Sequence, residues 1–522
     1  MTRYFKYIAL LLLIFVTGLV TAQTPTFSGS IAKIMYNNCT SCHNANGNAP
    51  FSLATYEQAY SMRMSIRNSV STNRMPPWPP ENGYGHFAKN RSLTDNQVND
   101  IKAWVDAGAP EGDKQSTPPL PFYSSGSQLG RKDFSAKLPN YTLVSNVDEY
   151  RCFVIPAGTN VTKYVSGLEI IPGNKKVVHH VLVFYDSLGV CRKLDEKTPE
   201  PGYVNFGNVG PNVDKLVGTW VPGSSPILFP QGTGVRVSAN GDFVLQVHYA
   251  PDYLGEMDES QINITYSDAT VNREIFLVPV LNHSTNMVNG PLVIAANTVK
   301  SFQEKQFVPY NVTLLGVAPH MHMIGTNIKS YAINVVGDTI KLINIPNWDF
   351  HWQGLYNFSK AIKLPAFSTL YAEASYDNTT NNPHNPNRAL PKKVTLGEST
   401  DDEMMLVYLA FMEYRAGDEK NLKIDTLNKT YLSIRNTSVN SNLFTIYPNP
   451  ISTINSVTVS MSTNNPSVNK KLVVTDVNGK QIFNTIFTGD SYTFILNEMP
   501  GIYFCEISNN YEKLIKKLVV TK

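Results

Sequence analysis

Six side chains that can bind a transition metal occur in a fixed order along the middle of the chain. Nitrogen-rich sites suit copper, zinc, iron or nickel, whereas a thioether favours copper and in particular Cu(I). Five imidazoles and one thioether therefore indicate two metal sites of three ligands each. The six residues are His179, His180, His248, His320, His322 and Met404.

The spacing of the histidines bears on which of them share a metal. The alternation in residues 243–248 is typical of a strand that carries His248. His320 and His322 are two residues apart, so on a strand they would face the same side and could reach one metal. His179 and His180 are neighbours and would face opposite sides. A shared metal there needs a bulge, or binding through different ring nitrogens.

Other histidines and methionines have more ordinary explanations. A methionine in an apolar strand usually packs in the core, and Met405 stands directly beside Met404. A lone histidine in a strand is usually a core residue, and only the presence of the other ligands argues otherwise for His248. Three histidines without partners at metal spacing are expected to be structural or exposed: His283, His351 and His384.

The motif Cys39-Thr-Ser-Cys42-His43 near the N-terminus predicts a covalently attached c-type haem. Each thiol would add to a haem vinyl group, and the imidazole of His43 would bind the iron. A C-x-x-C pair can also be a redox dithiol or half a zinc site. The adjacent histidine and the lack of a second C-x-x-C pair count against both.

Helical patterns around this motif fit a small cytochrome c domain. Ile31, Ile34 and Met35 form an apolar stripe before the motif. Residues 94–97 are a capping box that begins an amphipathic helix, which Gly108 ends.

The second axial ligand of the haem iron has several candidates. Met75 lies in a proline-stiffened loop and is favoured, because a methionine and histidine pair raises the haem potential, as in electron carriers. Met62 and Met64 lie in a predicted helix over 56–70 and are expected in the core or on the surface. His86 is the other exposed candidate.

The amino-acid composition limits which classes of protein the chain can belong to. The chain has 522 residues, enough for about three or four domains, with only 16% charged residues and a net charge of +3. No basic block supports nucleic-acid binding. The abundance of Pro, Gly and Tyr, with no long amphipathic helix after residue 113, indicates a mainly β chain.

The N-terminus predicts export. Arg3 and Lys6 precede the apolar run of residues 8–20, and Ala22 ends a typical signal-peptide cleavage site. A retained membrane anchor is the alternative, but the run is short for a span of about 20 residues. No later segment is apolar enough to cross a bilayer.

Four motifs along the middle of the chain resemble the copper type II, ascorbate-dependent monooxygenases, the family of the peptidylglycine α-hydroxylating and dopamine β-monooxygenases. The resemblance extends over residues 147–417, with the motifs in the family's order. They are Val177-Val-His-His-Val-Leu-Val-Phe184, Leu245-Gln-Val-His-Tyr249, Pro319-His-Met-His322 and Asp402-Glu-Met404.

The resemblance implies two antiparallel, jelly-roll-like sandwiches that divide near residue 285, with one copper site in each. One copper would be held by His179, His180 and His248, and the other by His320, His322 and Met404. The first would store an electron. The second would bind dioxygen and hydroxylate a C–H bond of a small-molecule or peptide-like substrate, using an external reductant such as ascorbate.

Three further residues are assigned by the same resemblance. It pairs Cys152 with Cys191 in a disulfide, for which two free buried thiols are the alternative. It places Tyr408 near the substrate, although a packed strand tyrosine would look the same. Ala318 departs from the pattern, because the peptide-amidating members have a carboxylate-binding arginine there. A peptide C-terminal glycine is therefore a doubtful substrate.

The final segment resembles the type A sorting domain of type IX secretion substrates. It begins at Leu443-Phe-Thr-Ile-Tyr-Pro-Asn-Pro450 and ends at Lys522. A generic β-sandwich binding module is the alternative. The resemblance implies Sec export to the periplasm and passage to the cell surface or the extracellular space, usually with removal of this domain.

The expected organisation is one small all-α domain followed by β domains. Its parts are a signal peptide (1–22), a cytochrome c domain (23–113), a linker (114–146), two copper domains (147–285 and 286–420), a linker (421–442) and a sorting domain (443–522).

Two alternative functions are compatible with the same residues. A haem–copper protein could carry electrons or bind metal at the cell surface without hydroxylating anything. A surface adhesion protein would bind no stoichiometric metal.

Overall fold

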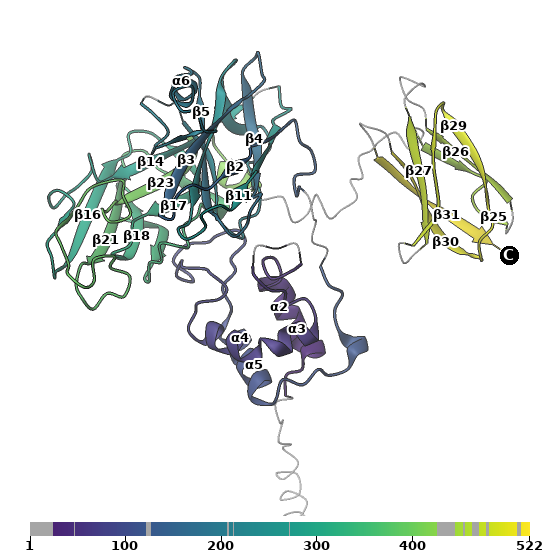
Figure 1. The fold of residues 1–522 in the computed structure, drawn as a ribbon, viewed down its shortest axis with the longest axis horizontal. Helices are drawn as coiled ribbons and strands as arrows, with labels where there is room; N and C mark the ends of the chain where they lie inside the picture. The colour runs from purple at the N-terminus through teal and green to yellow at the C-terminus, as the bar shows by residue number, and fades with distance from the viewer. Residues whose placement is uncertain are drawn as a thin grey trace, which may run out of the picture. The chain divides into compact units, whose positions relative to one another are not determined.

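Strands make up most of the regular structure in the computed structural model (Figure 1). The expected signal peptide lies outside the residues that the structure describes. The chain divides into two units, residues 1–427 and 428–522, which are treated separately below. The structure describes residues 24–45, 47, 49–121, 127–205, 208–211, 213, 215–270, 272–424, 444–452, 455–461, 469–476, 480–508 and 513–521.

Short helices around one small core form the helical module at the start of the first unit (Figure 1). The predicted capping box is confirmed, since the hydroxyl of Thr94 accepts from Gln97 N and the Gln97 side chain accepts in return. The helix expected over 56–70 is interrupted at Met62. The elements are η1 (Phe27–Ile31), α2 (Ala32–Asn38), α3 (Tyr56–Ser61), α4 (Arg63–Ser71), α5 (Asp95–Asp106) and η2 (Lys114–Ser116).

Two sheets with a common core form the first sheet pair. One has the order β6-β3-β10-β5-β7, and the other the order β1-β12-β4-β9-β13 with β8 beside β4. The strands are β1 (Phe134–Lys137), β2 (Tyr141–Thr142), β3 (Glu149–Pro156), β4 (Lys163–Ile171), β5 (Val178–Asp186), β6 (Tyr203–Val204), β7 (Lys215–Trp220), β8 (Ile227–Leu228), β9 (Thr233–Val237), β10 (Asp242–Tyr249), β11 (Met257–Asp258), β12 (Gln261–Tyr266) and β13 (Arg273–Glu274), with helix α6 (Val190–Asp195) after β5.

The expected linker over 114–146 is too long. β1 pairs with β12 and β2 pairs with β11, so residues 134–142 belong to the first sheet pair. Residues 134–142 join the first sheet pair because Leu138 and Tyr141 are almost fully buried in the core of that pair.

Two four-stranded sheets form the second sheet pair, with orders β14-β23-β17-β20 and β16-β21-β18-β19. β14 pairs with β23, so the division between the sheet pairs falls before Phe276 and not near residue 285. The strands are β14 (Phe276–Asn282), β15 (Val293–Ile294), β16 (Val299–Phe307), β17 (Val312–His320), β18 (Gly325–Ile333), β19 (Thr339–Ile345), β20 (Tyr356–Leu364), β21 (Thr369–Asp377), β22 (Val394–Thr395) and β23 (Leu406–Glu413), followed by α7 (Asp418–Asn421).

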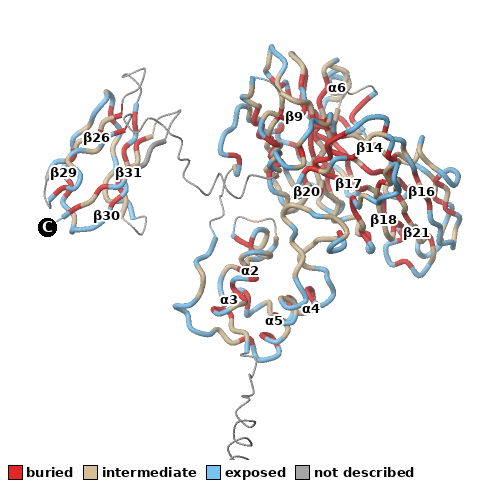
Figure 2. Tube along the Cα trace, turned by 180° about the vertical axis from the view of Figure 1, so that it is seen from behind, coloured by how far each residue is buried: buried red, intermediate tan, exposed pale blue. Residues whose placement is uncertain are grey.

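The two sheet pairs are packed directly against each other. Side chains from β14, β17, β20 and β23 belong to the core of the first sheet pair, among them Leu277, Leu315 and Met412. Figure 2 shows buried residues along the strands of both pairs. This continuous apolar packing fixes how residues of the two pairs face each other.

A loop of the helical module pairs with the edge strand β20. Ala88 N donates to Asn357 O at 2.8 Å, and Ser359 N donates to His86 O at 2.7 Å. The ring of Trp78 meets that of Tyr356 edge-on, with centroids 5.4 Å apart. The loop thereby attaches the helical module to the second sheet pair by main-chain hydrogen bonds and aromatic contacts.

The second unit is a small β domain with its own apolar core. Its sheets have the orders β24-β26-β29 and β25-β31-β30-β27-β28. Among the described parts of the chain, no helix is both long and apolar enough to span a membrane. The strands are β24 (Phe444–Tyr447), β25 (Ile451–Ser452), β26 (Asn455–Met461), β27 (Lys470–Asp476), β28 (Gln481–Phe487), β29 (Ser491–Leu496), β30 (Gly501–Ser508) and β31 (Lys513–Thr521).

Candidate metal centre

A bulge in β5 lets two neighbouring histidines face the same side. His248 of β10 lies opposite His180, but the next pair joins Tyr249 to Val178. His179 is therefore an extra residue in β5, and such a residue bends the strand and redirects its side chain. Of the two solutions that the sequence left open, the structure has the bulge.

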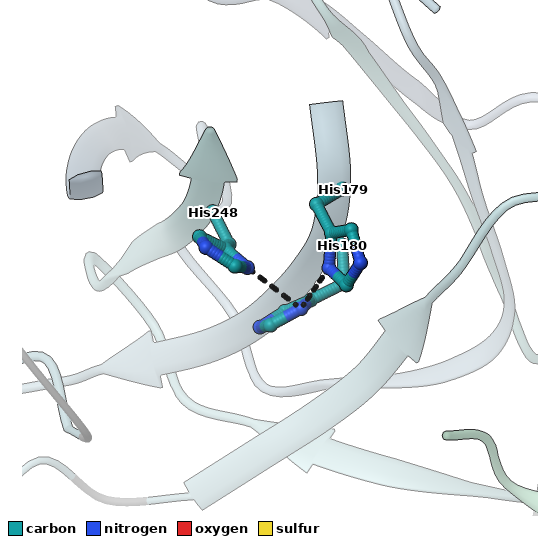
Figure 3. A group of neighbouring side chains, drawn as sticks. All are labelled: His179, His180 and His248. Carbon is teal, nitrogen blue, oxygen red and sulfur yellow. Dashed lines mark hydrogen bonds between the residues drawn. The ribbon is translucent and has the colours of Figure 1, made fainter. Parts of the chain in front are cut away.

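The Nδ1 atoms of His179 and His248 both lie close to that of His180 (Figure 3). His180 Nδ1 lies 3.3 Å from His179 Nδ1 and 3.3 Å from His248 Nδ1. A metal bound at about 2.0–2.1 Å from each nitrogen in a tetrahedral arrangement separates its ligand atoms by about 3.3 Å. The spacing of the nitrogens thus fits one shared ion, and His179, His180 and His248 are called the first ligand set below.

Burial and one carboxylate act on different histidines of the first ligand set. Burial lowers the pKa of His179 to about 4 and holds that of His180 well below its usual value. His248 Nε2 lies 2.6 Å from Asp148 Oδ1. Donation from this nitrogen to the carboxylate leaves the Nδ1 lone pair for a metal, as a carboxylate beyond the ligands commonly does.

His320, His322 and Met404, the second ligand set, come together from two loops and a strand end. His320 is the last residue of β17 and His322 follows the strand, so the expectation that both lie on one strand is wrong for His322. Their ring centroids are nevertheless 5.1 Å apart. A turn between strand ends brings the rings together, whereas the expectation relied on strand alternation.

Hydrogen bonds leave the Nε2 atoms of the second ligand set available. His320 Nδ1 bonds to Gln353 Oε1, and His322 Nδ1 lies 3.1 Å from the carbonyl oxygen of Asp402. Both acceptors require a protonated Nδ1, so each Nε2 carries a lone pair. The two free Nε2 atoms, together with the thioether of Met404, are suitable ligands for one metal ion.

One buried carboxylate holds the backbone of the second ligand set. Glu403 is fully buried and accepts from His322 N at 2.9 Å, Ile324 N at 2.8 Å and Met404 N at 3.2 Å. It therefore joins the turn after β17 to the segment that carries Met404. Burial raises the pKa of Glu403 to about 8.

Five of the six ligand residues line one cavity of about 360 Å³ between the two sheet pairs: His179, His180, His320, His322 and Met404. Phe350 lies between the two sets, with its ring centroid 6.4 Å from that of His179 and 5.9 Å from that of His322. Tyr408 and Ala318 also line the cavity. Among the described lining residues there is one carboxylate, Glu398, and no lysine or arginine.

Five residues near the ligands were missed by sequence reasoning. Three carry no signal in the sequence, because only the fold brings them beside a histidine: Asp148, Phe350 and Gln353. His283 and His351 were expected to be structural or exposed, and both line the cavity. His283 Nδ1 is bonded to the backbone of Met405, while His351 is exposed with its ring 5.7 Å from that of His179.

The predicted haem motif lies directly after α2 and its thiols are unpaired. Cys39 and Cys42 are free, and His43 Nδ1 lies 3.1 Å from Phe51 O. A protonated Nδ1 leaves His43 Nε2 for the iron. Met75 is half-buried in the loop after α4, and its role as a ligand stays a prediction.

The expected disulfide partners lie in one small cluster. Cys152 and Cys191 are fully buried together with Tyr203, Val209 and Val244. Both are free thiols in the structure, so their pairing stays a prediction.

Comparison with known families identifies the second unit. Residues 445–521 match the secretion system C-terminal sorting domain. The expected sorting domain is therefore confirmed, and the protein is exported by type IX secretion to the cell surface or the extracellular space. No curated protein matches the chain.

Solved structures give only weak likenesses. The β-glucuronidase of Parabacteroides merdae shares 8% identity over 46% of this chain and 30% of its own, with a TM-score of 0.13. That of Bifidobacterium dentium shares 7% over 42% and 39%, with 0.12. The BSP domain of a biofilm associated protein shares 9% over 78% and 84%, with 0.14. The chain thus spans about a third of the two glucuronidases, and these scores support no conclusion about fold or activity.

Asp148→Ala should weaken metal binding at the first ligand set. Without the carboxylate, His248 loses the partner that orients its ring, and affinity should fall about 10- to 100-fold. Competition with a copper chelator measures this, and Asp148→Asn should restore part of the affinity. Asp349→Ala removes a nearby carboxylate that bonds to His351 and should change little. Equal affinity in Asp148→Ala and the wild type would refute the orienting role.

Glu403→Gln should weaken metal binding at the second ligand set only. The amide nitrogen would face backbone N–H donors, and each unmet donor costs about 1–3 kcal/mol. Glu304→Gln is the matched control, because Glu304 is equally buried and neither of its oxygens has a partner among the described residues. Chelator competition should show a loss in Glu403→Gln alone, and equal affinities in both variants would contradict the role of Glu403.

Proposed function

We propose that this protein is an extracellular copper-dependent monooxygenase that hydroxylates a C–H bond, with electrons supplied through a covalent haem. The net reaction joins one oxygen atom of dioxygen to carbon and releases the other as water, which consumes two electrons and two protons. The observation that carries the proposal is one cavity lined by residues of two different ligand sets, two from the first set and all three from the second. Copper, when bound, supplies one-electron chemistry and dioxygen activation.

The two ligand sets have different chemical tasks. Three imidazoles at the first set suit a centre that exchanges an electron with a donor. The second set adds the thioether of Met404, which favours Cu(I), the state that reacts with dioxygen. Two sites with one electron each would together meet the demand of the reaction.

The charges of the residues that line the cavity indicate which kind of substrate it can bind. Ala318 leaves no cation at the position where the peptide-amidating members bind a carboxylate, and no lysine or arginine replaces it among the described lining residues. Burial raises the pKa of Tyr408 to about 12, so its hydroxyl stays protonated and can donate to a substrate. We therefore favour a substrate without a free carboxylate, and a peptide with a C-terminal glycine is disfavoured.

A non-hydroxylating haem–copper protein is the second candidate. It is supported by one observation: the first ligand set by itself brings three histidine ligand atoms within 4.8 Å of one another, which suffices for one copper that exchanges electrons. Such a protein would bind one copper and one haem, and would pass electrons without consuming dioxygen in the presence of organic substrates.

Copper content and oxygen uptake separate the two candidates. The wild-type protein should bind two coppers, and His248→Ala should keep only the one at the second ligand set. Elemental analysis measures the content, and a library of benzylic, peptidyl and aliphatic compounds tests reductant-driven oxygen uptake with product formation. Two coppers at full affinity in His248→Ala would refute the first site, and the absence of oxygen uptake and of product with every compound would favour the second candidate.

A further inference from the structure

The haem motif lies against the first sheet pair at one glycine. A Cβ placed at Gly223 would be 2.7 Å from Cys42 Sγ and 3.2 Å from Arg91 Nη1. The first distance is below van der Waals contact, so only glycine lets the backbone approach the cysteine this closely. Lys175 Nζ also donates to Gly47 O at 3.1 Å, which makes a second contact with the segment that follows the motif.

Gly223 belongs to a tight turn that follows β7. Val221 N donates to Ser224 Oγ at 3.2 Å, and Ser224 N donates to Val221 O at 2.9 Å. The φ of Gly223 is +81°, a conformation that other residues rarely adopt. The turn is therefore held in the shape that faces Cys42.

The same turn reaches the metal cavity. Trp220 and Val221 both line it. Trp220 lies opposite Val181 in the pairing of β7 with β5, and Val181 directly follows His180. A short packed route thus joins Cys42 to the first ligand set, through Gly223 and Trp220.

We infer that the turn Val221–Ser224 is the electron-entry contact between the haem module and the first ligand set. The inference rests on the proposed haem and copper content. One electron would leave the ferrous iron and reach the oxidised copper held by His179, His180 and His248, with no bond made and no proton moved. Electron tunnelling weakens steeply with the gap between donor and acceptor, so a glycine contact favours transfer.

The contact between the haem module and the first sheet pair does not depend on the linker expected over residues 114–146. The loop of residues 76–91 is bonded to β20, and Arg91 at its end adjoins Gly223. The helical module is therefore attached to both sheet pairs, so that electron donor and acceptor are held together within one molecule.

Flash photoreduction of the haem in the copper(II)-loaded full-length protein tests the inference. Haem absorbance should return in a first-order process whose rate does not depend on protein concentration. In Gly223→Ala this rate should fall at least several-fold, with haem potential and copper content unchanged, because the methyl group displaces Cys42 from the turn.

Gly255→Ala is the matched control. Gly255 lies in the same sheet pair with a φ of +84°, and a Cβ there would meet nothing within 4 Å. Gly255→Ala puts the same strain on the backbone but affects no contact with the haem motif. The rate of electron transfer in this variant should therefore equal that of the wild type. If Gly223→Ala does not fold, Lys175→Ala should show a smaller slowing, and an unchanged rate there would overturn the inference.

Other outcomes separate this inference from the proposed function. A wild-type rate in folded Gly223→Ala, or a rate that rises with protein concentration, would overturn the entry contact alone. Transfer that depends on Gly223 in a protein that hydroxylates no compound would support the contact and refute the monooxygenase.

Discussion

The bulge at His179 is the constraint on which the proposed chemistry depends. A regular strand would point His179 and His180 to opposite faces, and no single ion could reach both. One extra residue opposite β10 turns both rings toward His248. The Nδ1 atoms of His179 and His248 then each lie 3.3 Å from that of His180, a spacing that one metal ion can bridge. Asp148 then fixes the third ring. The site is thus produced by a local irregularity in an otherwise regular ladder.

The rigid packing of the two sheet pairs makes a single cavity out of two ligand sets. Because β14 and β23 contribute side chains to the core of the first pair, the pairs cannot slide without disturbing that core. The second ligand set has no comparable bulge. It depends on the carboxylate of Glu403, which ties the backbone of His322 to that of Met404. Phe350 fills the space between the sets.

Sequence patterns predicted the parts whose cause is local. The capping box at residues 94–97 and the sorting domain are confirmed, because both depend on neighbouring residues or a continuous motif. The domain division expected near residue 285 falls before Phe276 in the structure, because β14 pairs with β23, over a hundred residues further along the chain. For the same reason Asp148 and Gln353 escaped notice: each meets its histidine only after folding. The identity of the metals and of the substrate belongs to the proposed function.

Copper-edge anomalous diffraction from crystals of the copper-loaded protein tests the central claim most directly. The account predicts one peak between His179, His180 and His248, at about 2.0–2.1 Å from all three Nδ1 atoms. A second peak should lie beside Nε2 of His320 and His322, next to the sulfur of Met404. Copper bound through Nε2 at the first position, or no peak between those three rings, would contradict the account.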